Sequence, residues 1–285
     1  MNITSNKVSL KCKDYSVSGA YFELKHDDDL DILITSPQPK SEELGQYYKS
    51  EDYISHTDAK RNLFEKLYHT VKGIALKRKL NLINSFDNET KSLLDVGCGT
   101  GDFLQIAKAN GWKVCGIEPD EGARQLAINK VGNHIKDAST INTLPNNSFD
   151  VITLWHVLEH LPNLDLQIET YKRLLKPKGT LIIAVPNFKS YDANYYKAYW
   201  AAFDVPRHLW HFSQTGISKI LAKQQFKIKN TLPMLFDAFY VCLLSEKYKT
   251  GQMNFVKAFQ IGLLSNLKAK RSGEYSSLIY IVKNE

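Results

Sequence analysis

The sequence contains few cysteines, and none of them has the spacing of a metal site. Four cysteines are scattered through 285 residues, and no two stand in a Cys-x-x-Cys pair. Disulfide frameworks belong to short secreted chains with closely spaced cysteines, and a structural zinc ion needs four ligands. The pattern therefore predicts a protein without disulfides or a bound metal, in a reducing compartment.

Long apolar runs are also missing. Residues 1–15 lack an apolar core like that of a signal peptide. The longest apolar run, residues 235–244, is interrupted by Asp237 and is shorter than the roughly 20 residues that span a bilayer. We therefore predict a cytoplasmic protein. Hydrophobic residues make up 43% of the chain and charged residues 24%, which is typical of a globular protein with a sizeable core.

The net charge is +7, and the basic residues gather at 72–79 and 268–271. Both stretches have a helical pattern, so we interpret them first as solvated helix faces. The more specific alternative for each stretch is contact with nucleic acid or with an anionic membrane surface.

The first part of the chain is predicted to form a small cap, residues 1–56. Residues 20–24 and 30–35 are expected to be the strands of a hairpin around an acidic turn, and Pro37 ends the second strand. A short helix should open at residues 41–43. The main domain, residues 57–285, should then begin with a long helix over 57–85, capped by Thr57 or Asp58. The apolar face of this helix is expected to comprise Leu63, Leu67, Val71 and Ile74.

From residue 92 onward, strands and helices alternate. The apolar runs are continuous, as expected for strands buried on both faces, and the alternation predicts an α/β fold around a parallel sheet. The tail adds two amphipathic helices near 236–248 and 254–270. The expected strands cover 92–96, 114–117, 134–136, 149–154, 180–185, 226–232 and 276–282. Helices are expected at 102–110, 122–130, 164–175 and 213–224.

A glycine-rich loop, Gly97-Cys98-Gly99-Thr100-Gly101, follows the first of these strands. Glycine at alternate positions lets the backbone turn tightly and leaves space for a ligand. In a dinucleotide fingerprint the third glycine comes one position later, and pyrophosphate needs a positive helix N-terminus. Asp102 stands at that terminus and Asp95 precedes the loop, so we expect a cationic ligand without phosphate.

Two further carboxylates follow the next two strands. Glu118 lies 23 residues after Asp95, where a carboxylate can accept hydrogen bonds from the vicinal hydroxyls of a ribose. Asp137 follows the third strand, where it could accept from an adenine amino group or be an ordinary surface acid.

These motifs resemble those of Rossmann-like, S-adenosylmethionine-dependent methyltransferases, in particular a bacterial group related to the quinone-biosynthesis O-methyltransferases. The resemblance is carried by LLDVGCGTGDF, VCGIEPD, SFDVITLWHVLEHLPN and LLKPKGTLIIAVPN, which lie between residues 93 and 187. It implies a mostly parallel seven-stranded sheet with helices on both faces and an antiparallel last strand. It also implies S-adenosyl-L-methionine as the cofactor. The residues that it places around the cofactor are Asp95, Gly97, Cys98, Gly99, Gly101, Glu118, Pro119, Asp137, Ala138, Trp155 and His156.

A general base is needed only if the methyl acceptor must lose a proton, and histidine suits that role near neutral pH. We predict His208 as the first candidate and His160 as the second. Some relatives carry a Glu-x-x-Glu-His cluster that uses a divalent metal. This chain has His156 in place of the first glutamate, and we predict no metal.

Residues 188–212 are unusually aromatic and follow the fifth strand. They are expected either to form an acceptor pocket or lid, or to pack as a satellite core against the N-terminal region. Tyr47, Tyr48, Tyr53 and His56 are expected to close such a pocket from the other side. Relatives often begin with paired cysteines, and because only Cys12 is present here we interpret the hairpin as metal-free.

The sequence favours a small-molecule acceptor, methylated on oxygen, nitrogen or carbon. A nucleic-acid methyltransferase, a nicotinamide-dependent oxidoreductase and a non-catalytic cofactor-binding module remain alternatives. Nucleic acid is disfavoured because Trp155-His156-Val157-Leu158 replaces the motif used on base amines, and no Pro-Cys dipeptide occurs. Core packing is the first interpretation of the two C-terminal helices, with Phe236, Phe239, Tyr240, Leu243 and Leu244. Shallow membrane contact for a lipophilic acceptor is the alternative.

Overall fold

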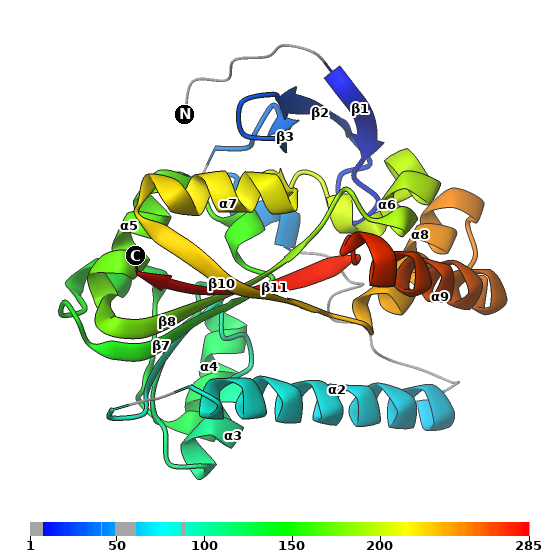
Figure 1. The fold of residues 1–285 in the computed structure, drawn as a ribbon. Coiled ribbons are helices and arrows are strands. Elements are labelled where there is room, and N and C mark those ends of the chain that lie inside the picture. Colours follow the sequence, from blue (N-terminus) through cyan, green and yellow to red (C-terminus); the bar gives the residue numbers. More distant parts are fainter. Residues whose placement is uncertain (1–7, 41, 49–60, 87–88, 285) are drawn as a thin grey trace.

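The computed structural model describes residues 8–40, 42–48, 61–86 and 89–284, and within 61–69 it describes the backbone alone. The expected caps Thr57 and Asp58, and the pocket residues Tyr53 and His56, lie outside these residues. The chain folds around a seven-stranded sheet with helices on both faces (Figure 1). The sheet order is β10-β11-β8-β7-β4-β5-β6.

All seven strands predicted for this sheet are present. Neighbouring strands from β6 to β8 are parallel, whereas β11 runs antiparallel to both β8 and β10. The predicted α/β class and antiparallel last strand are therefore confirmed. The strands are β4 (Ser92–Val96), β5 (Lys113–Ile117), β6 (Ile135–Lys136), β7 (Phe149–Trp155), β8 (Leu175–Pro186), β10 (Phe226–Pro233) and β11 (Ser277–Asn284).

Helices cover the two faces of the sheet in separate groups (Figure 1). On one face lie α2 (Arg61–Asn84), α3 (Asp102–Ala109) and α4 (Glu121–Val131), and on the other α5 (Leu164–Leu174) and α7 (Gln214–Lys223). The predicted apolar face of α2 is wrong at Ile74, which is 40% exposed. Among the α2 side chains that the structure describes, Leu76, Leu80, Leu82 and Ile83 pack against the core, whereas those of Leu63 and Leu67 lie outside the described residues.

A second, smaller sheet joins distant parts of the chain. The expected hairpin forms from β2 (Tyr21–Asp27) and β3 (Ile32–Ser36). Two strands that the sequence analysis did not expect flank it, β1 (Val8–Lys13) and β9 (Trp210–Phe212). Because β9 comes from the aromatic segment, the N-terminal cap and that segment share one sheet.

The aromatic segment is mostly core. It contains α6 (Tyr191–Tyr196) and the short turns η4 (Lys197–Tyr199) and η5 (Ala201–Phe203). Its five most buried aromatic side chains are Tyr196, Trp200, Phe203, Trp210 and Phe212. Packing, one of the two expected alternatives, therefore describes these residues.

A helical hairpin, α8 (Asp237–Thr250) and α9 (Phe255–Ser272), connects β10 to β11 and packs beside α6. A buried carboxylate ties these elements together. Asp192 of α6 accepts hydrogen bonds from the Trp200 indole (2.7 Å), the Ser265 hydroxyl of α9 (2.6 Å) and the Ser276 hydroxyl (2.7 Å). The hairpin is thus held by specific polar contacts as well as by apolar packing.

Candidate cofactor and acceptor site

The glycine-rich loop connects β4 to α3 at the carboxyl edge of the parallel sheet. Gly97, Gly99 and Gly101 all have left-handed backbone angles, with φ of +68°, +54° and +78°. A Cβ on Gly97 would lie 2.4 Å from the Val157 side chain, and one on Gly101 would lie 2.9 Å from Ala127. A Cβ on Gly99 would meet no atom within 4 Å. Gly97 and Gly101 are therefore required by packing, and Gly99 is the residue that leaves space for a ligand.

Glu118 stands at the end of β5 and holds this loop. Its carboxylate accepts hydrogen bonds from the backbone amides of Gly99 (2.8 Å) and Asp120 (3.0 Å). Burial raises the pKa of Glu118 above its ordinary value. Each carboxylate oxygen keeps a further lone pair, so the group is able to accept from a pair of vicinal hydroxyls.

Arg124, in α4, links the loops that follow β5 and β6. Its guanidinium donates to the carbonyls of Glu118 (2.7 Å) and Pro119 (2.8 Å) and forms an ion pair with Asp137 (3.1 Å). The other Asp137 oxygen accepts from the Ser139 amide and hydroxyl, which lowers the pKa of Asp137. Arg124 was not among the predicted site residues, although its place shortly after Pro119 was a signal for it.

The remaining predicted loop residues differ in the groups that they can offer to a ligand. The Cys98 thiol points into the core, toward the space beside Gly116, and burial raises its pKa. Pro119 and Ala138 are exposed at the loop surfaces. Cys98 can therefore offer a ligand its backbone only, while Pro119 and Ala138 can offer apolar contact.

Asp95 is buried at the end of β4 and accepts a hydrogen bond of 2.6 Å from the Thr153 hydroxyl. Burial raises the pKa of Asp95 to about 6, although Thr153 and Lys79 act to lower it. The Lys79 ammonium lies 4.4 Å from the centroid of the Trp155 ring. Burial lowers the pKa of Lys79, and the charges of Asp95 and Asp237 oppose this shift. Lys79 thus belongs to the site, whereas the sequence pattern favoured a solvated helix face for residues 72–79.

Asp102 has a different role from the one expected. Its carboxylate binds the ammonium groups of Lys72 (2.6 Å) and Lys130 (2.7 Å). Burial acts to raise its pKa, but these hydrogen bonds hold the pKa of Asp102 at about 2. Asp102 was expected to repel a phosphate-bearing ligand. Because two lysines neutralise its charge, this repulsion is weaker than expected. It connects α2, α3 and α4.

His156 follows β7 and is held between two carboxylates. Its Nε2 lies 2.9 Å from Asp237 at the start of α8, and its Nδ1 lies 3.4 Å from Glu159. Burial disfavours the charged ring, but hydrogen bonds to Asp237 and Glu159 raise the pKa of His156 to about 10. His156 is therefore a cation near neutral pH and cannot serve there as a base. Asp237 was visible in the sequence as the charge that interrupts an apolar run.

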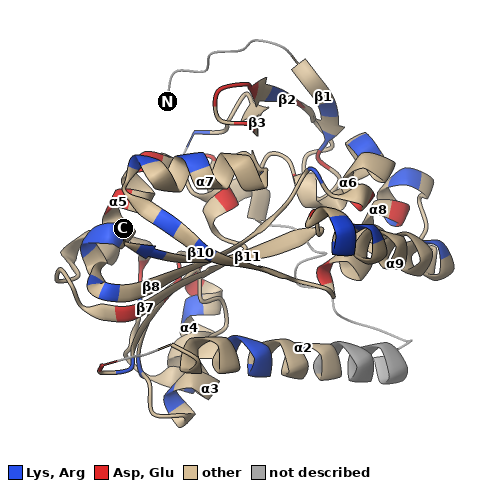
Figure 2. Ribbon diagram, in the orientation of Figure 1, with Lys and Arg blue, Asp and Glu red and all other residues tan. Residues whose placement is uncertain are grey.

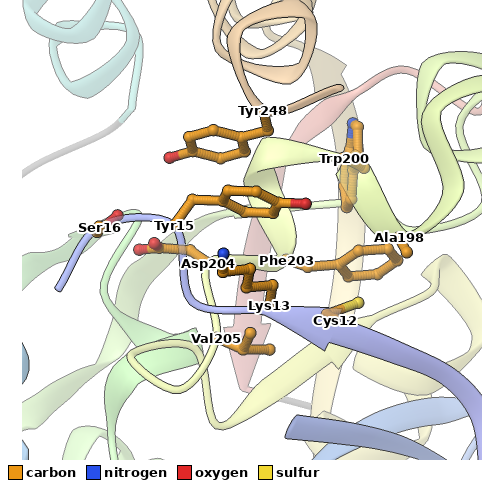
Figure 3. A pocket seen from close by; sticks show the side chains of 10 residues that line it. All are labelled: Cys12, Lys13, Tyr15, Ser16, Ala198, Trp200, Phe203, Asp204, Val205 and Tyr248. Atoms are coloured by element: carbon orange, nitrogen blue, oxygen red, sulfur yellow. The ribbon is translucent and has the colours of Figure 1, made fainter. Parts of the chain in front are cut away.

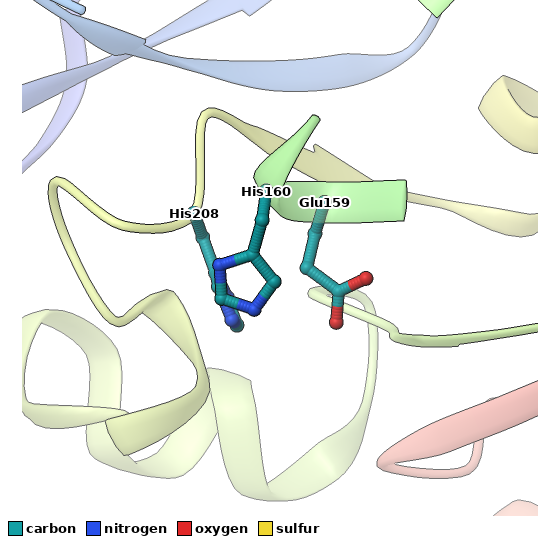
Figure 4. Close-up of side chains that lie close together, drawn as sticks. All are labelled: Glu159, His160 and His208. Carbon is teal, nitrogen blue, oxygen red and sulfur yellow. The ribbon is translucent and has the colours of Figure 1, made fainter. Parts of the chain in front are cut away.

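Glu159, His160 and His208 come together at the turn after β7 (Figure 4). One ligand atom from each residue lies within 4.8 Å of the others, and the two imidazole rings are 4.5 Å apart. Glu159 is 1% exposed; its Oε1 faces His156 at 3.4 Å, and its Oε2 has no hydrogen-bond partner. Burial acts to raise the pKa of Glu159, but the neighbouring histidines lower it. A carboxylate and two imidazoles could also coordinate a divalent cation.

The two buried histidines of the aromatic segment are neutral. Nδ1 of His208 donates to the Ala202 carbonyl (2.9 Å), which leaves the lone pair on Nε2. Burial and the neighbouring His160 hold the pKa of His208 well below 6.5. Burial lowers the pKa of His211 to about 3, and its Nε2 lies 3.0 Å from the Thr35 hydroxyl. His211 therefore stabilises the small sheet.

The surroundings of His160 are more open than those of His208. His160 is half-buried, and its Nδ1 lies 3.0 Å from the Tyr48 hydroxyl and 3.1 Å from the Arg207 carbonyl. Tyr48 thus reaches the cluster from the N-terminal side, where the sequence analysis expected it. A separate pocket is lined by Tyr15, Trp200 and Tyr248 (Figure 3). It has room for little more than a water molecule.

The residues present fit S-adenosylmethionine. An open side at Gly99, a carboxylate at Glu118 and a buried anion at Asp95 suit a small ligand with a ribose and positive charge. The Trp155 indole N–H is buried and has no partner. This arrangement defines a Rossmann-like site for a nucleoside cofactor.

Comparison with known proteins gives the family. A family profile described as "Methyltransferase domain" matches residues 67–230, more than half of the chain. The chain therefore belongs to the S-adenosylmethionine-dependent methyltransferase family, and S-adenosylmethionine is its cofactor.

Curated relatives are similar over part of their length. A "Ubiquinone biosynthesis O-methyltransferase" of Haemophilus ducreyi is 36% identical over 34% of this chain and 46% of its own length. One of Hydrogenovibrio crunogenus is 31% identical over 40% of this chain and 51% of its own length. The aligned region thus spans about half the length of these relatives.

Solved structures share the fold. A SAM-dependent methyltransferase from Archaeoglobus fulgidus has a TM-score of 0.52 at 19% identity, covering 78% of this chain and 98% of that one. Geranyl diphosphate C-methyltransferase from Streptomyces coelicolor has a TM-score of 0.53 at 12% identity, covering 76% and 80%. At these identities the likeness concerns the fold alone.

Proposed function

We propose that this protein transfers the methyl group of S-adenosylmethionine to a hydroxyl of a small aromatic or quinone-like molecule. The bound cofactor supplies a methyl group already activated by its sulfonium. Asp95, Glu118, Asp137, Trp155 and the glycine-rich loop hold it. The names of the curated relatives, ubiquinone biosynthesis O-methyltransferases, support oxygen as the methylated atom.

The observation that carries the proposal is the buried cluster of Glu159, His160 and His208. A hydroxyl usually must lose its proton when it attacks a methyl carbon, and a histidine can take that proton. An anionic Glu159 beside the two rings stabilises the imidazolium that forms. Its Oε2 has no hydrogen-bond partner, so this oxygen can interact with the new positive charge.

The charges around the cluster favour the same proton transfer. Near pH 7 the cationic His156 balances one of its two carboxylate partners, Asp237 and Glu159. One negative charge is left over beside two histidines. A residual negative charge favours a proton on a neighbouring imidazole.

Of the two histidines, His160 is the better proton acceptor. His208 is 8% exposed, and its depressed pKa makes it a weak base. His160 is half-buried and faces Tyr48. We therefore propose that His160 takes the proton and that His208 positions its ring, which reverses the order expected from the sequence.

The test is methyl transfer from labelled S-adenosylmethionine to a panel of catechols and hydroquinones with and without apolar tails. We expect an O-methyl product, identified by mass spectrometry. His160→Ala should lower kcat by about 10²-fold or more, the usual contribution of a general base, without weakening cofactor binding. His134→Ala, a change at an exposed histidine elsewhere, is the matched control.

Two results would contradict this function. One is methyl transfer to RNA, or to nitrogen or carbon only. The other is a rate that His160→Ala and His208→Ala leave unchanged. If a chelator abolished activity and a divalent cation restored it, the cluster would be a metal site and the proton-acceptor role would be wrong.

A further inference from the structure

The exposed side of α9 is apolar, which is unusual for a helix on a protein surface. Phe255, Phe259, Leu263 and Leu267 recur every fourth residue and so lie on one face of the helix. They are 57%, 59%, 41% and 48% exposed, and Val256 beside them is 70% exposed. A surface helix normally turns polar residues to solvent.

Apart from Phe259, whose ring stacks on Phe239 of α8 at 5.3 Å between centroids, these residues are not part of the buried side of α9. Ala258, Ile261, Gly262, Ser265 and Ala269 are buried, and they lie on the opposite side of the helix. Of the α8 residues named in the sequence analysis, Leu243 is buried in the core. Core packing therefore explains the inward faces of the hairpin, but it leaves the outward face of α9 unexplained.

The apolar surface is concentrated on this hairpin. Among the described residues, nine of the seventeen large hydrophobic side chains that are exposed lie between 235 and 267. Single exposed hydrophobic residues are ordinary, whereas a contiguous group marks an interaction surface. We call Val256, Phe259, Leu263 and Leu267, with Phe255, the α9 patch.

The charges that surround the α9 patch have one sign. The sequence of α9 contains four basic residues and no acidic residue, as Figure 2 shows. Lys257 and Lys268 lie over the Tyr195 and Tyr191 rings of α6, and Lys270 and Arg271 are exposed at the end of the helix. Of the two acids in α8, Asp237 binds His156 and Glu246 is buried, where it accepts a hydrogen bond from Tyr196. Neither of them offsets the positive charge that the hairpin presents to solvent.

We propose that the α9 patch docks on an anionic lipid bilayer. An apolar face flanked by lysine and arginine is the pattern of a helix that lies in the plane of a membrane interface. The apolar side chains enter the boundary of the acyl chains, and the basic side chains contact the lipid phosphates. None of the helices in the described residues is long and apolar enough to cross a membrane, so the contact is peripheral.

The helical hairpin that carries the α9 patch also contacts the candidate site. α8 begins at Asp237, which binds His156 in the cofactor and acceptor site. The docking surface and the site are therefore parts of one packed unit. The proposal concerns a surface remote from the chemistry, and it stands whether or not the acceptor is a phenol.

The test is co-sedimentation of the purified protein with lipid vesicles. We expect binding to phosphatidylcholine vesicles that contain phosphatidylglycerol, weaker binding to pure phosphatidylcholine, and weakening at high salt because the charges are screened. Val256→Ser with Leu267→Ser should reduce vesicle binding by about tenfold, because two apolar side chains no longer leave water. Lys270→Gln with Arg271→Gln should weaken binding to the anionic vesicles alone.

The matched control is Leu126→Ser with Leu166→Ser. These leucines are 52% and 56% exposed on α4 and α5, far from α9 in the fold. The control should bind vesicles like the unchanged protein, and circular dichroism with cofactor titration should show that all variants are folded.

The proposal is overturned if the unchanged protein stays in the supernatant at low salt. It is also overturned if the variant with Val256→Ser and Leu267→Ser binds vesicles as well as the control with Leu126→Ser and Leu166→Ser. It is also overturned if sedimentation velocity shows a dimer that Val256→Ser with Leu267→Ser dissolves while no variant binds vesicles. The α9 patch would then be a contact between two copies of this chain.

Discussion

At the scale of single residues, the candidate cofactor site consists of a few backbone and carboxylate positions. Gly99 leaves space, Glu118 holds the loop and Asp95 supplies a buried anion. These three were predictable from the sequence, because each stands at the end of a strand and parallel strands end at one edge of a sheet. Lys79 and Asp237 were not, because their part in the site depends on which side of α2 and α8 packs inward.

Asp95 should make cofactor affinity depend on pH. Its carboxyl has a pKa of about 6, and a bound cation favours the ionised form and so lowers that pKa. Binding therefore releases a proton below pH 6. Affinity should be level above about pH 7 and fall as the pH decreases through 6, by at most about tenfold per unit.

Isothermal titration calorimetry between about pH 8 and pH 5 measures this dependence. Asp95→Asn should bind more weakly near neutral pH and lose affinity less steeply on acidification, since the titrating group is gone. An identical pH slope in the two proteins would show that another group is responsible.

At the scale of elements, the sequence predicted the large sheet well and the small sheet incompletely. Strands of the large sheet are continuous apolar runs, which are easy to recognise. β9 has three residues within an aromatic segment, and its role depends on pairing with β3, far away in sequence. Its short pattern carries no periodicity, so nothing local distinguished it from a loop.

Asp192 should be among the largest single contributions to the stability of the α6, α8 and α9 region. Asp192→Ala removes three hydrogen bonds and leaves the Trp200 indole and the Ser265 and Ser276 hydroxyls buried without partners. We expect a loss of about 3 kcal/mol in the free energy of unfolding. Urea denaturation measures it, with the exposed Glu169→Ala as control. A loss below about 1 kcal/mol would mean that water or new partners replace the carboxylate.

At the scale of the whole molecule, the candidate functional residues lie at one edge of the large sheet. The loops after β4, β5, β6 and β7 carry the candidate cofactor residues, and the aromatic segment and α8 contribute the other residues of the candidate site. The α/β class follows from the alternation of strands and helices, and the cofactor from the resemblance of the loop motifs, so both could be predicted from the sequence. The proposed acceptor side is assembled from distant segments, so its geometry could not be predicted from the sequence.

The most direct test of the cofactor site is calorimetric titration of S-adenosylmethionine into the unchanged protein, Glu118→Ala and Gly99→Arg. Glu118→Ala should bind about 100-fold more weakly, because the ribose and the Gly99 amide both lose a charged acceptor. Gly99→Arg should fold but not bind detectably, since its side chain enters the open space beside the loop. Glu169→Ala should bind like the unchanged protein. Undiminished binding in both Glu118→Ala and Gly99→Arg would contradict the assignment of the site.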